Sequence, residues 1–188
     1  MKNLFSTLTL TMSTAVAIAF IAIAPAQAIT YDFSWSGNSN YSAKGSFSFD
    51  ENIVPTSFSE SGPGATNFLQ SLNISFFDPA NNFISAYDNV VNGISTTNYF
   101  KFNFDTNTQE IFGLIDFGGE VAGDTYLKGV VNSELSLFQV PQSGADFIID
   151  GNSGSLLVQA IPESNSILGL LSLGMLGLTS QIKRKFKY

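Results

Sequence analysis

The sequence predicts an all-β ectodomain, a jelly-roll-like antiparallel β-sandwich over residues 29–160. Apolar and polar side chains alternate at every second residue through this region, as in strands that have one buried and one wet face. Turn-forming pairs of Gly, Asn, Asp and Pro separate the alternating segments. No segment has the apolar stripe of a packed helix, and at most one helical turn is expected, at residues 65–72.

The alternation is clearest in the segments "TYDFSWS", "GSFSFD" and "YFKFNFD", where aromatic residues occupy one face and polar residues the other. The aromatic residues expected to face the core are Tyr31, Phe33, Trp35, Phe47, Phe49, Phe100, Phe102 and Phe104. Further strands are expected at residues 68–77, 83–88, 110–117, 124–131, 134–139, 145–150 and 155–160. Eight to ten short strands at this spacing are typical of a sandwich.

The composition restricts both the core and the chemistry of this chain of 188 residues. Fifteen of the 18 phenylalanines lie in residues 29–162, together with the one Trp and five Tyr, and this aromatic content suits a core without disulfides. The chain has no Cys and no His. Catalysis by Ser–His–Asp or Cys–His groups and zinc sites built on histidine are therefore excluded.

The middle of the chain is strongly acidic. Residues 29–162 carry 14 acidic residues and three lysines, a net charge of −11. Because phosphate binding requires Lys or Arg contacts, nucleic acid is not expected as a partner. The same charge disfavours adsorption to an anionic membrane and favours solubility and cations.

The N-terminal segment predicts a signal peptide at residues 1–28. Lys2 precedes an apolar stretch at residues 15–24, and the small-residue sequence Ala26-Gln27-Ala28 follows it. This order predicts export with cleavage between Ala28 and Ile29. The alternative is a retained N-terminal anchor.

The C-terminal segment, residues 161–188, predicts a membrane helix with a basic end. Residues 167–182 are apolar with a few polar members, and a helix of that length, at roughly 1.5 Å per residue, is about 24 Å long. This length is short for a span, but basic side chains that reach the interface extend it. The basic cluster places this end in the cytoplasm and residues 29–162 outside; it consists of Lys183, Arg184, Lys185 and Lys187.

The tail as a whole resembles the PEP-CTERM sorting signal of exopolysaccharide-producing Gram-negative bacteria and cyanobacteria. Pro162-Glu163 is followed by a short polar spacer, the stretch "ILGLLSLGMLGL" and the basic "KRKFK". The motif is a P-E-S variant, because Ser164 stands where the family has a second proline. The resemblance implies transient anchoring in the inner membrane, processing near Pro162-Glu163 by an exosortase-type enzyme, and a final location at the cell surface, in the outer envelope or outside the cell. The alternative is an anchor that is never cleaved.

Two loops have the composition of a weak calcium site. "DFGGEVAGD" contains Asp116, Glu120 and Asp124 among glycines, and "DGNSGS" contains Asp150 and Asn152. Oxygen-rich loops of this kind suit a hard cation, although neither has the EF-hand spacing. The alternative is that both are ordinary hairpin turns and that the protein has no cofactor.

Carbohydrate binding and glycoside hydrolysis are the functions that the composition leaves open. Sugar stacking needs exposed aromatic rings, and most of the candidates fall on the core-facing alternation; they are Trp35, Tyr31, Tyr41, Tyr87, Tyr99 and Tyr126. Hydrolysis needs a pair of carboxylates about a cleft, and no pair among the acidic residues can be singled out. We expect a non-enzymatic structural or interaction role at the surface or in the matrix, with a lectin-like module for exopolysaccharide, with or without the assistance of calcium, as the alternative.

Overall fold

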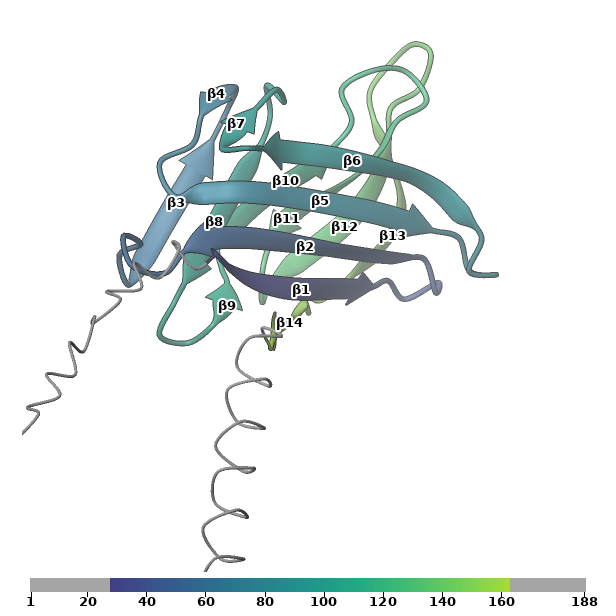
Figure 1. Cartoon of the computed structure of the whole chain (residues 1–188). Coiled ribbons are helices and arrows are strands. Elements are labelled where there is room, and N and C mark those ends of the chain that lie inside the picture. Colours follow the sequence, from purple (N-terminus) through teal and green to yellow (C-terminus); the bar gives the residue numbers. More distant parts are fainter. Residues whose placement is uncertain (1–27, 163–188) are drawn as a thin grey trace, which may run out of the picture.

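A computed structural model describes residues 28–162, which form two antiparallel sheets packed face to face (Figure 1). This arrangement confirms the all-β prediction. Both sheets and the core between them lie within the described residues. Most of the predicted signal peptide and the sorting segment from Glu163 onward, including the basic cluster, lie outside them.

Sheet A contains the two strands at the ends of the described chain. Its middle strands are nine residues long, and its members at one edge are only two residues long. In order across the sheet the strands are β14 (Leu157–Ile161), β1 (Ala28–Ser36), β2 (Ser42–Asp50), β5 (Leu69–Phe77), β6 (Phe83–Val91), β7 (Ile94–Ser95) and β4 (Gly64–Ala65).

Sheet B covers the other side of the core. Its last four strands follow one another both along the chain and across the sheet, a meander that the expectation of a jelly roll did not anticipate. In order the strands are β13 (Phe147–Asn152), β12 (Glu134–Gln139), β11 (Thr125–Val130), β10 (Leu114–Gly118), β8 (Lys101–Asp105) and β3 (Ser57–Ser61), with β9 (Glu110–Ile111) beside β8.

The expected strands appear, but one of them is divided, and β3, β4 and β7 were not predicted. The strand expected at 110–117 is divided into β9 and β10, because the Asn103 amide donates to the carbonyl oxygens of Phe112 and Leu114 and replaces the regular ladder there. The helical turn considered at residues 65–72 was wrong. The Glu60 carboxylate accepts the backbone N–H groups of Asn67 and Phe68, which holds this segment as a non-helical turn before β5.

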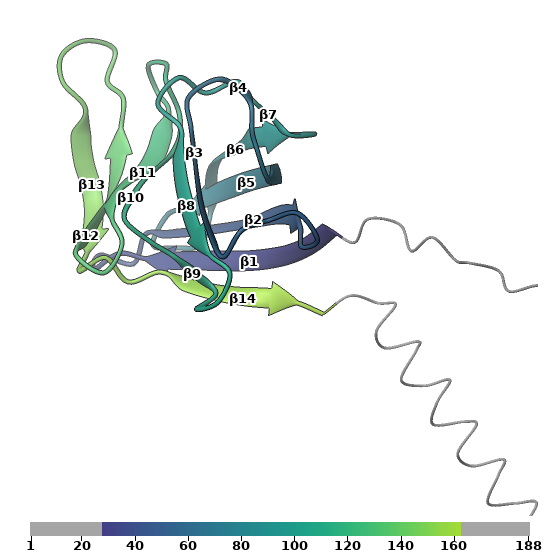
Figure 2. The same ribbon diagram turned by 90° about the vertical axis from the view of Figure 1, so that its left-hand side faces the viewer.

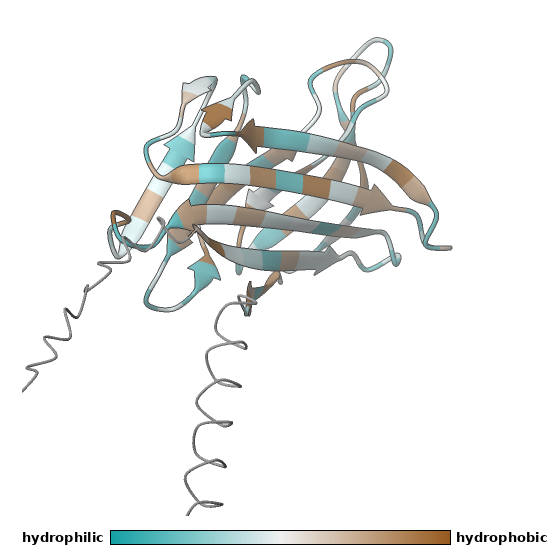
Figure 3. Cartoon of the chain, viewed as in Figure 1, coloured by the Kyte–Doolittle hydropathy of each residue, from teal (hydrophilic) through white to brown (hydrophobic). Residues whose placement is uncertain are grey.

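The core is a layer of aromatic rings contributed by both sheets. Phe47 of sheet A packs edge-on against Phe102 and Phe104 of sheet B, with ring centroids 4.9 Å apart in each pair. Tyr31 stacks on Phe47 at 5.3 Å. Hydrophobic and hydrophilic residues alternate along β5 in Figure 3, and the same alternation buries every aromatic residue that the sequence assigned to the core.

Gly45 leaves room for one of these rings. A Cβ atom at position 45 would lie 2.4 Å from the Phe33 ring and 2.2 Å from the carbonyl oxygen of Asn73. Phe33 is the residue opposite Gly45 on β1, so its ring covers the surface that the glycine leaves bare. A larger residue in the middle of β2 would displace this ring.

The two ends of the described chain lie side by side. Thr30 near the start of β1 is opposite Ile161 at the end of β14. Figure 2 shows both ends on one side of the molecule, while the loop between β12 and β13 projects at the opposite end. A protein tethered through either terminus would therefore present this loop end away from the point of attachment.

None of residues 28–162 belongs to a helix that could cross a membrane.

Replacement of Phe47 by Ala tests the aromatic layer. We expect Phe47→Ala to lower the free energy of unfolding by about 3–5 kcal/mol, because it removes a buried ring that contacts both sheets. Phe83→Ala removes the same atoms from a side chain that is 63% exposed and is expected to cost no more than about 0.5 kcal/mol. Urea unfolding of both variants measures the difference, and equal losses would contradict this description of the core.

Candidate functional site

The outer face of sheet B carries a polar pocket near its loop end. Along β10, Ile115 and Phe117 point into the core, so Asp116 between them points outward. Along β11, Leu127 points inward, and Tyr126 and Lys128 share the outer face with Asp116. Strand alternation therefore places an acid, a phenol and an amine next to one another.

The pocket is small and chemically mixed. Its volume is about 290 Å³, near the lower limit of ligand pockets and suited to a single small ring. Its rim includes the loop from β10 to β11 and the end of the loop from β12 to β13. The polar and aromatic side chains that border it are Tyr99, Asp116, Glu120, Tyr126, Lys128 and Asp146.

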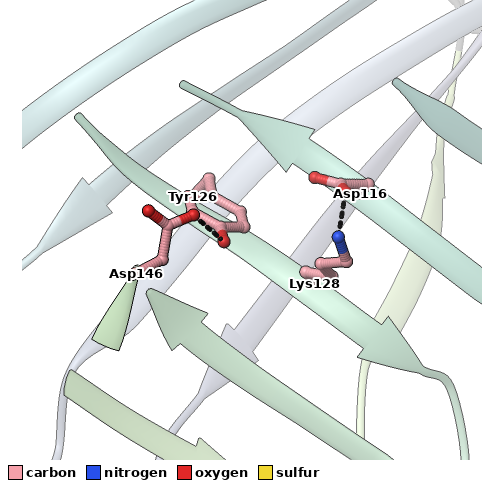
Figure 4. A network of polar contacts seen from close by, with 4 residues as sticks. All are labelled: Asp116, Tyr126, Lys128 and Asp146. Carbon is pink, nitrogen blue, oxygen red and sulfur yellow. Dashed lines mark hydrogen bonds and ion pairs between the residues drawn. The ribbon is translucent and has the colours of Figure 1, made fainter. Parts of the chain in front are cut away.

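Asp116 and Lys128 form an ion pair in this pocket (Figure 4). Lys128 Nζ lies 3.0 Å from Asp116 Oδ2, and the lysine side chain is 44% exposed. Asp116 itself is only 5% exposed, and this burial raises the pKa of its carboxyl group. The charges of Lys128 and Lys101 act in the opposite direction without cancelling the effect of burial. The pocket therefore contains a carboxyl group that takes up a proton more readily than an exposed aspartate does.

Tyr126 is a fixed hydrogen-bond donor beside this pair. Its hydroxyl donates to Asp146 Oδ2 at 2.7 Å, and its ring stacks on Phe138 with centroids 5.1 Å apart. Burial, followed by the hydrogen bond and the charge of Asp146, raises the pKa of Tyr126 well above its usual value. The hydroxyl group therefore remains protonated.

Tyr99 is the tyrosine whose ring faces solvent at this pocket. It is 65% exposed, whereas Trp35 and Tyr31 are buried in the core as their alternation predicted. Tyr41 and Tyr87 are partly buried against the core. Of the aromatic residues that the sequence offered for sugar stacking, the structure leaves Tyr99 available beside a group of polar side chains.

The structure does not gather Asp116, Glu120 and Asp124 around a common point suited to a cation. Asp124 Oδ2 accepts the backbone N–H groups of Glu120 and Val121 at 2.8 and 2.9 Å, which closes the loop. Glu120 accepts hydrogen bonds from the backbone and side-chain amides of Asn98. Across residues 28–162, no three acidic side chains are grouped closely enough to hold a metal ion.

Asp150 of the second calcium candidate has a structural role. Its buried carboxylate accepts the backbone N–H groups of Ser39, Tyr41 and Gly151, and so ties the β1–β2 turn to β13. A Cβ atom at position 37 would lie 2.1 Å from Asp150 Oδ2, so only glycine fits there. The Asn152 side chain donates to the carbonyl oxygens of Ser36 and Ser155 and supports the same turn.

Three carboxylates border the pocket, and each has a protein partner. Asp116 pairs with Lys128, Asp146 accepts from Tyr126, and Glu120 accepts from Asn98. Such a set of charged and hydrogen-bonding groups can bind and orient the polar groups of a ligand. The sequence did not single out Lys128 or Asp146, although the alternation in 124–131 already put Lys128 on the face of Tyr126.

The chain matches no family model and has no significant match among curated proteins or among solved structures.

The raised pKa of Asp116 predicts a pH dependence of stability. In the unfolded chain this carboxyl group ionises near its ordinary pKa of 3.8, whereas in the folded protein it ionises at higher pH. Its contribution to stability is therefore complete below pH 3.8 and is lost as the pH rises through the folded pKa. We expect the free energy of unfolding of the wild type, minus that of Asp116→Asn, to fall as the pH rises from about 4 to 7. Urea unfolding across this range measures the difference, and an increase with pH would contradict the assignment.

Proposed function

We propose that this is an exported surface or matrix protein that acts by binding, and that the pocket on sheet B takes a sugar unit. The observation that carries the proposal is the exposed Tyr99 ring at the border of a pocket lined by carboxylate, ammonium and phenol groups. A sugar ring has an apolar face of C–H groups that stacks on an aromatic ring. Its hydroxyl groups both donate and accept, so they match a mixed set of polar side chains.

The charge of the domain restricts the sugar. Fourteen acidic residues and three lysines in residues 29–162 repel acidic polysaccharides at low ionic strength. Lys128, the basic side chain of the pocket, is already paired with Asp116. We therefore propose an uncharged sugar. The same charge argues against nucleic acid as a partner.

Export and sorting form the second part of the proposal. The segment preceding Ile29, the Pro162-Glu163 motif and the basic tail support translocation, transient anchoring in the inner membrane and processing by an exosortase-type enzyme. The adjacent positions of Thr30 and Ile161 support this topology, because both flanking segments join the domain at the end away from the pocket.

The proposed sugar binding is tested with small neutral sugars and with two substitutions of Tyr99. We expect a glycan array to identify neutral monosaccharides or disaccharides that bind, and Tyr99→Ala to weaken that binding about three- to tenfold by loss of the stacking surface. Tyr99→Phe keeps the ring and is expected to bind as the wild type does. Calorimetry with each variant measures the affinity.

Three outcomes would count against this assignment. Equal binding by the wild type and Tyr99→Ala would contradict the assignment of sugar binding to the pocket on sheet B. Loss of binding in EDTA would support the calcium-assisted alternative, and turnover of the bound sugar would replace binding with hydrolysis as the function.

The sorting proposal predicts the C-terminus of the mature protein. We expect mass spectrometry of the surface or extracellular form to find a chain that begins at Ile29 and ends near Pro162-Glu163. Replacement of Pro162 and Glu163 by alanine should cause the uncleaved form to accumulate in the membrane. A C-terminal peptide ending in "KFKY" in the extracellular form would contradict processing.

A further inference from the structure

The outer face of sheet A carries a second, different polar surface. Its outward side chains form rows that run across the strands, because residues opposite one another in the register lie side by side. One row contains an acidic or amide side chain on four of its five strands. In order from β14 to β6, the row is Gln159, Asp32, Ser46, Asn73 and Asp88.

The neighbouring row adds hydroxyl groups and one amine. Ser34 of β1, Lys44 of β2 and Ser75 of β5 lie opposite one another in it. On the other side, the hydroxyl groups of Ser48 and Ser71 are 2.6 Å apart. Five strands at about 4.8 Å per spacing make each complete row about 19 Å long.

These rows line two adjoining depressions that meet at Asn73, here called the trough. A depression of about 690 Å³ extends from β14 to β5, and a second of about 640 Å³ extends from β2 to the β6–β7 turn. Both include Asn73, whose amide donates to Ser46 Oγ at 2.8 Å. Asp32, Asp88 and Gln159 are exposed, and none of them makes a side-chain hydrogen bond to another residue in the range 28–162. Their polar atoms are available to a ligand.

Two aromatic rings stand at the margin of the trough. Phe77 lies opposite Phe83, and their ring centroids are 6.2 Å apart in an edge-on arrangement. Phe83 is 63% exposed, and Lys44 Nζ lies 5.6 Å from the centre of the Phe77 ring. The sequence contained a signal for an outward-facing ring at this position. Phe76 and Phe77 are adjacent in one strand, so only one of them can point into the core.

We propose that this trough binds a linear, uncharged polysaccharide chain that lies across the strands. Hydrogen-bonding groups recur at the spacing of the strands along the row from Gln159 to Asp88, which suits a chain of repeating sugar units that offers hydroxyl groups at regular intervals. The rings of Phe77 and Phe83 supply the stacking surface at the margin. The net charge of −11 over residues 29–162 disfavours an acidic chain.

The composition of the trough argues against a protein partner. Protein interfaces are depleted in Ser and Asp at their centres and depend on Trp, Tyr and Arg anchors. The trough has Ser46 and Asn73 at its centre instead, with Asp32 and Asp88 farther out, and its apolar lining consists of aliphatic side chains and Phe rings. A polysaccharide, whose units carry both hydroxyl groups and apolar C–H faces, matches this mixture.

The test is the dependence of affinity on chain length. Residues 28–162 contain both sheets and the whole core, so this domain is used directly. The probes are β-linked glucose oligosaccharides of increasing length, together with a neutral β-glucan, a galactomannan and an α-glucan in affinity gel electrophoresis. We expect an oligosaccharide long enough to cross all five strands to bind at least about tenfold more tightly than the disaccharide, because it reaches the whole row.

Matched variants assign the binding to the trough. Asp32→Ala and Phe83→Ala are each expected to weaken binding of the long chain about three- to tenfold. Ser59→Ala, an exposed change on β3 of sheet B, should have no effect. Tyr99→Ala should also leave long-chain binding unchanged. Polysaccharide binding in the trough can therefore be confirmed while sugar binding in the pocket is contradicted, and the reverse.

Several results would overturn the proposal. They are retention of none of the three polysaccharides, equal affinity for short and long oligosaccharides, and full binding by both trough variants. Loss of long-chain binding in Tyr99→Ala alone would assign the polysaccharide to sheet B. A cationic glycan is run in the same gels, and retention by it alone would show that Asp32 and Asp88 act through charge and would likewise overturn the proposal.

Discussion

The packing of aromatic rings between the two sheets is the interaction on which the rest of this structure depends. Phe47 contacts Tyr31 within its own sheet and Phe102 and Phe104 across the interface. With no cysteine in the chain, no disulfide supports the sandwich, and this layer holds the sheets together. It also determines the outer surfaces, because a strand that buries one set of alternate residues must expose the other set.

The buried acidic residues differ in what stabilises their charge. Asp150 and Glu60 accept hydrogen bonds from backbone N–H groups. These hydrogen bonds fix loops, and they occupy the carboxylate oxygens that a ligand would need. Asp116 instead faces a partly exposed lysine at the border of a pocket. Its partner Lys128 has a long, partly exposed side chain, so a ligand can compete with Lys128 for the Asp116 carboxylate. This difference in partners separates the structural acids from the one at the candidate site.

The two outer faces of the sandwich offer different chemistry on opposite sides of one core. Sheet B has a small pocket that combines an ion pair, a tyrosine hydroxyl and an exposed ring. Sheet A has a long trough of hydroxyl, amide and carboxylate groups. If both proposals hold, the domain has two binding surfaces that face away from each other and could link separate glycan chains, with the avidity that two linked sites provide. Two such surfaces would be a physical basis for the proposed role in an extracellular matrix.

The sequence by itself determined the fold class and the buried faces. The alternation in segments such as "YFKFNFD" requires a strand with Phe102 and Phe104 on one side, whatever the neighbouring strands are. The composition by itself excluded histidine and cysteine chemistry, because the chain contains neither residue. The strands β4 and β7 were missed because two residues are too few to show a period, and β3 was missed because one of its two inward positions is the acidic Glu60.

Only the tertiary structure decided which outward residues meet. Tyr126 and Asp146 are 20 positions apart, and Gln159 and Asp32 come from opposite ends of the described chain. Their proximity depends on strand order and register, and a period of two specifies neither, since the same pattern is compatible with many pairings. The sequence therefore identified the faces of the strands, while the pairing of distant strands produced the sites on them.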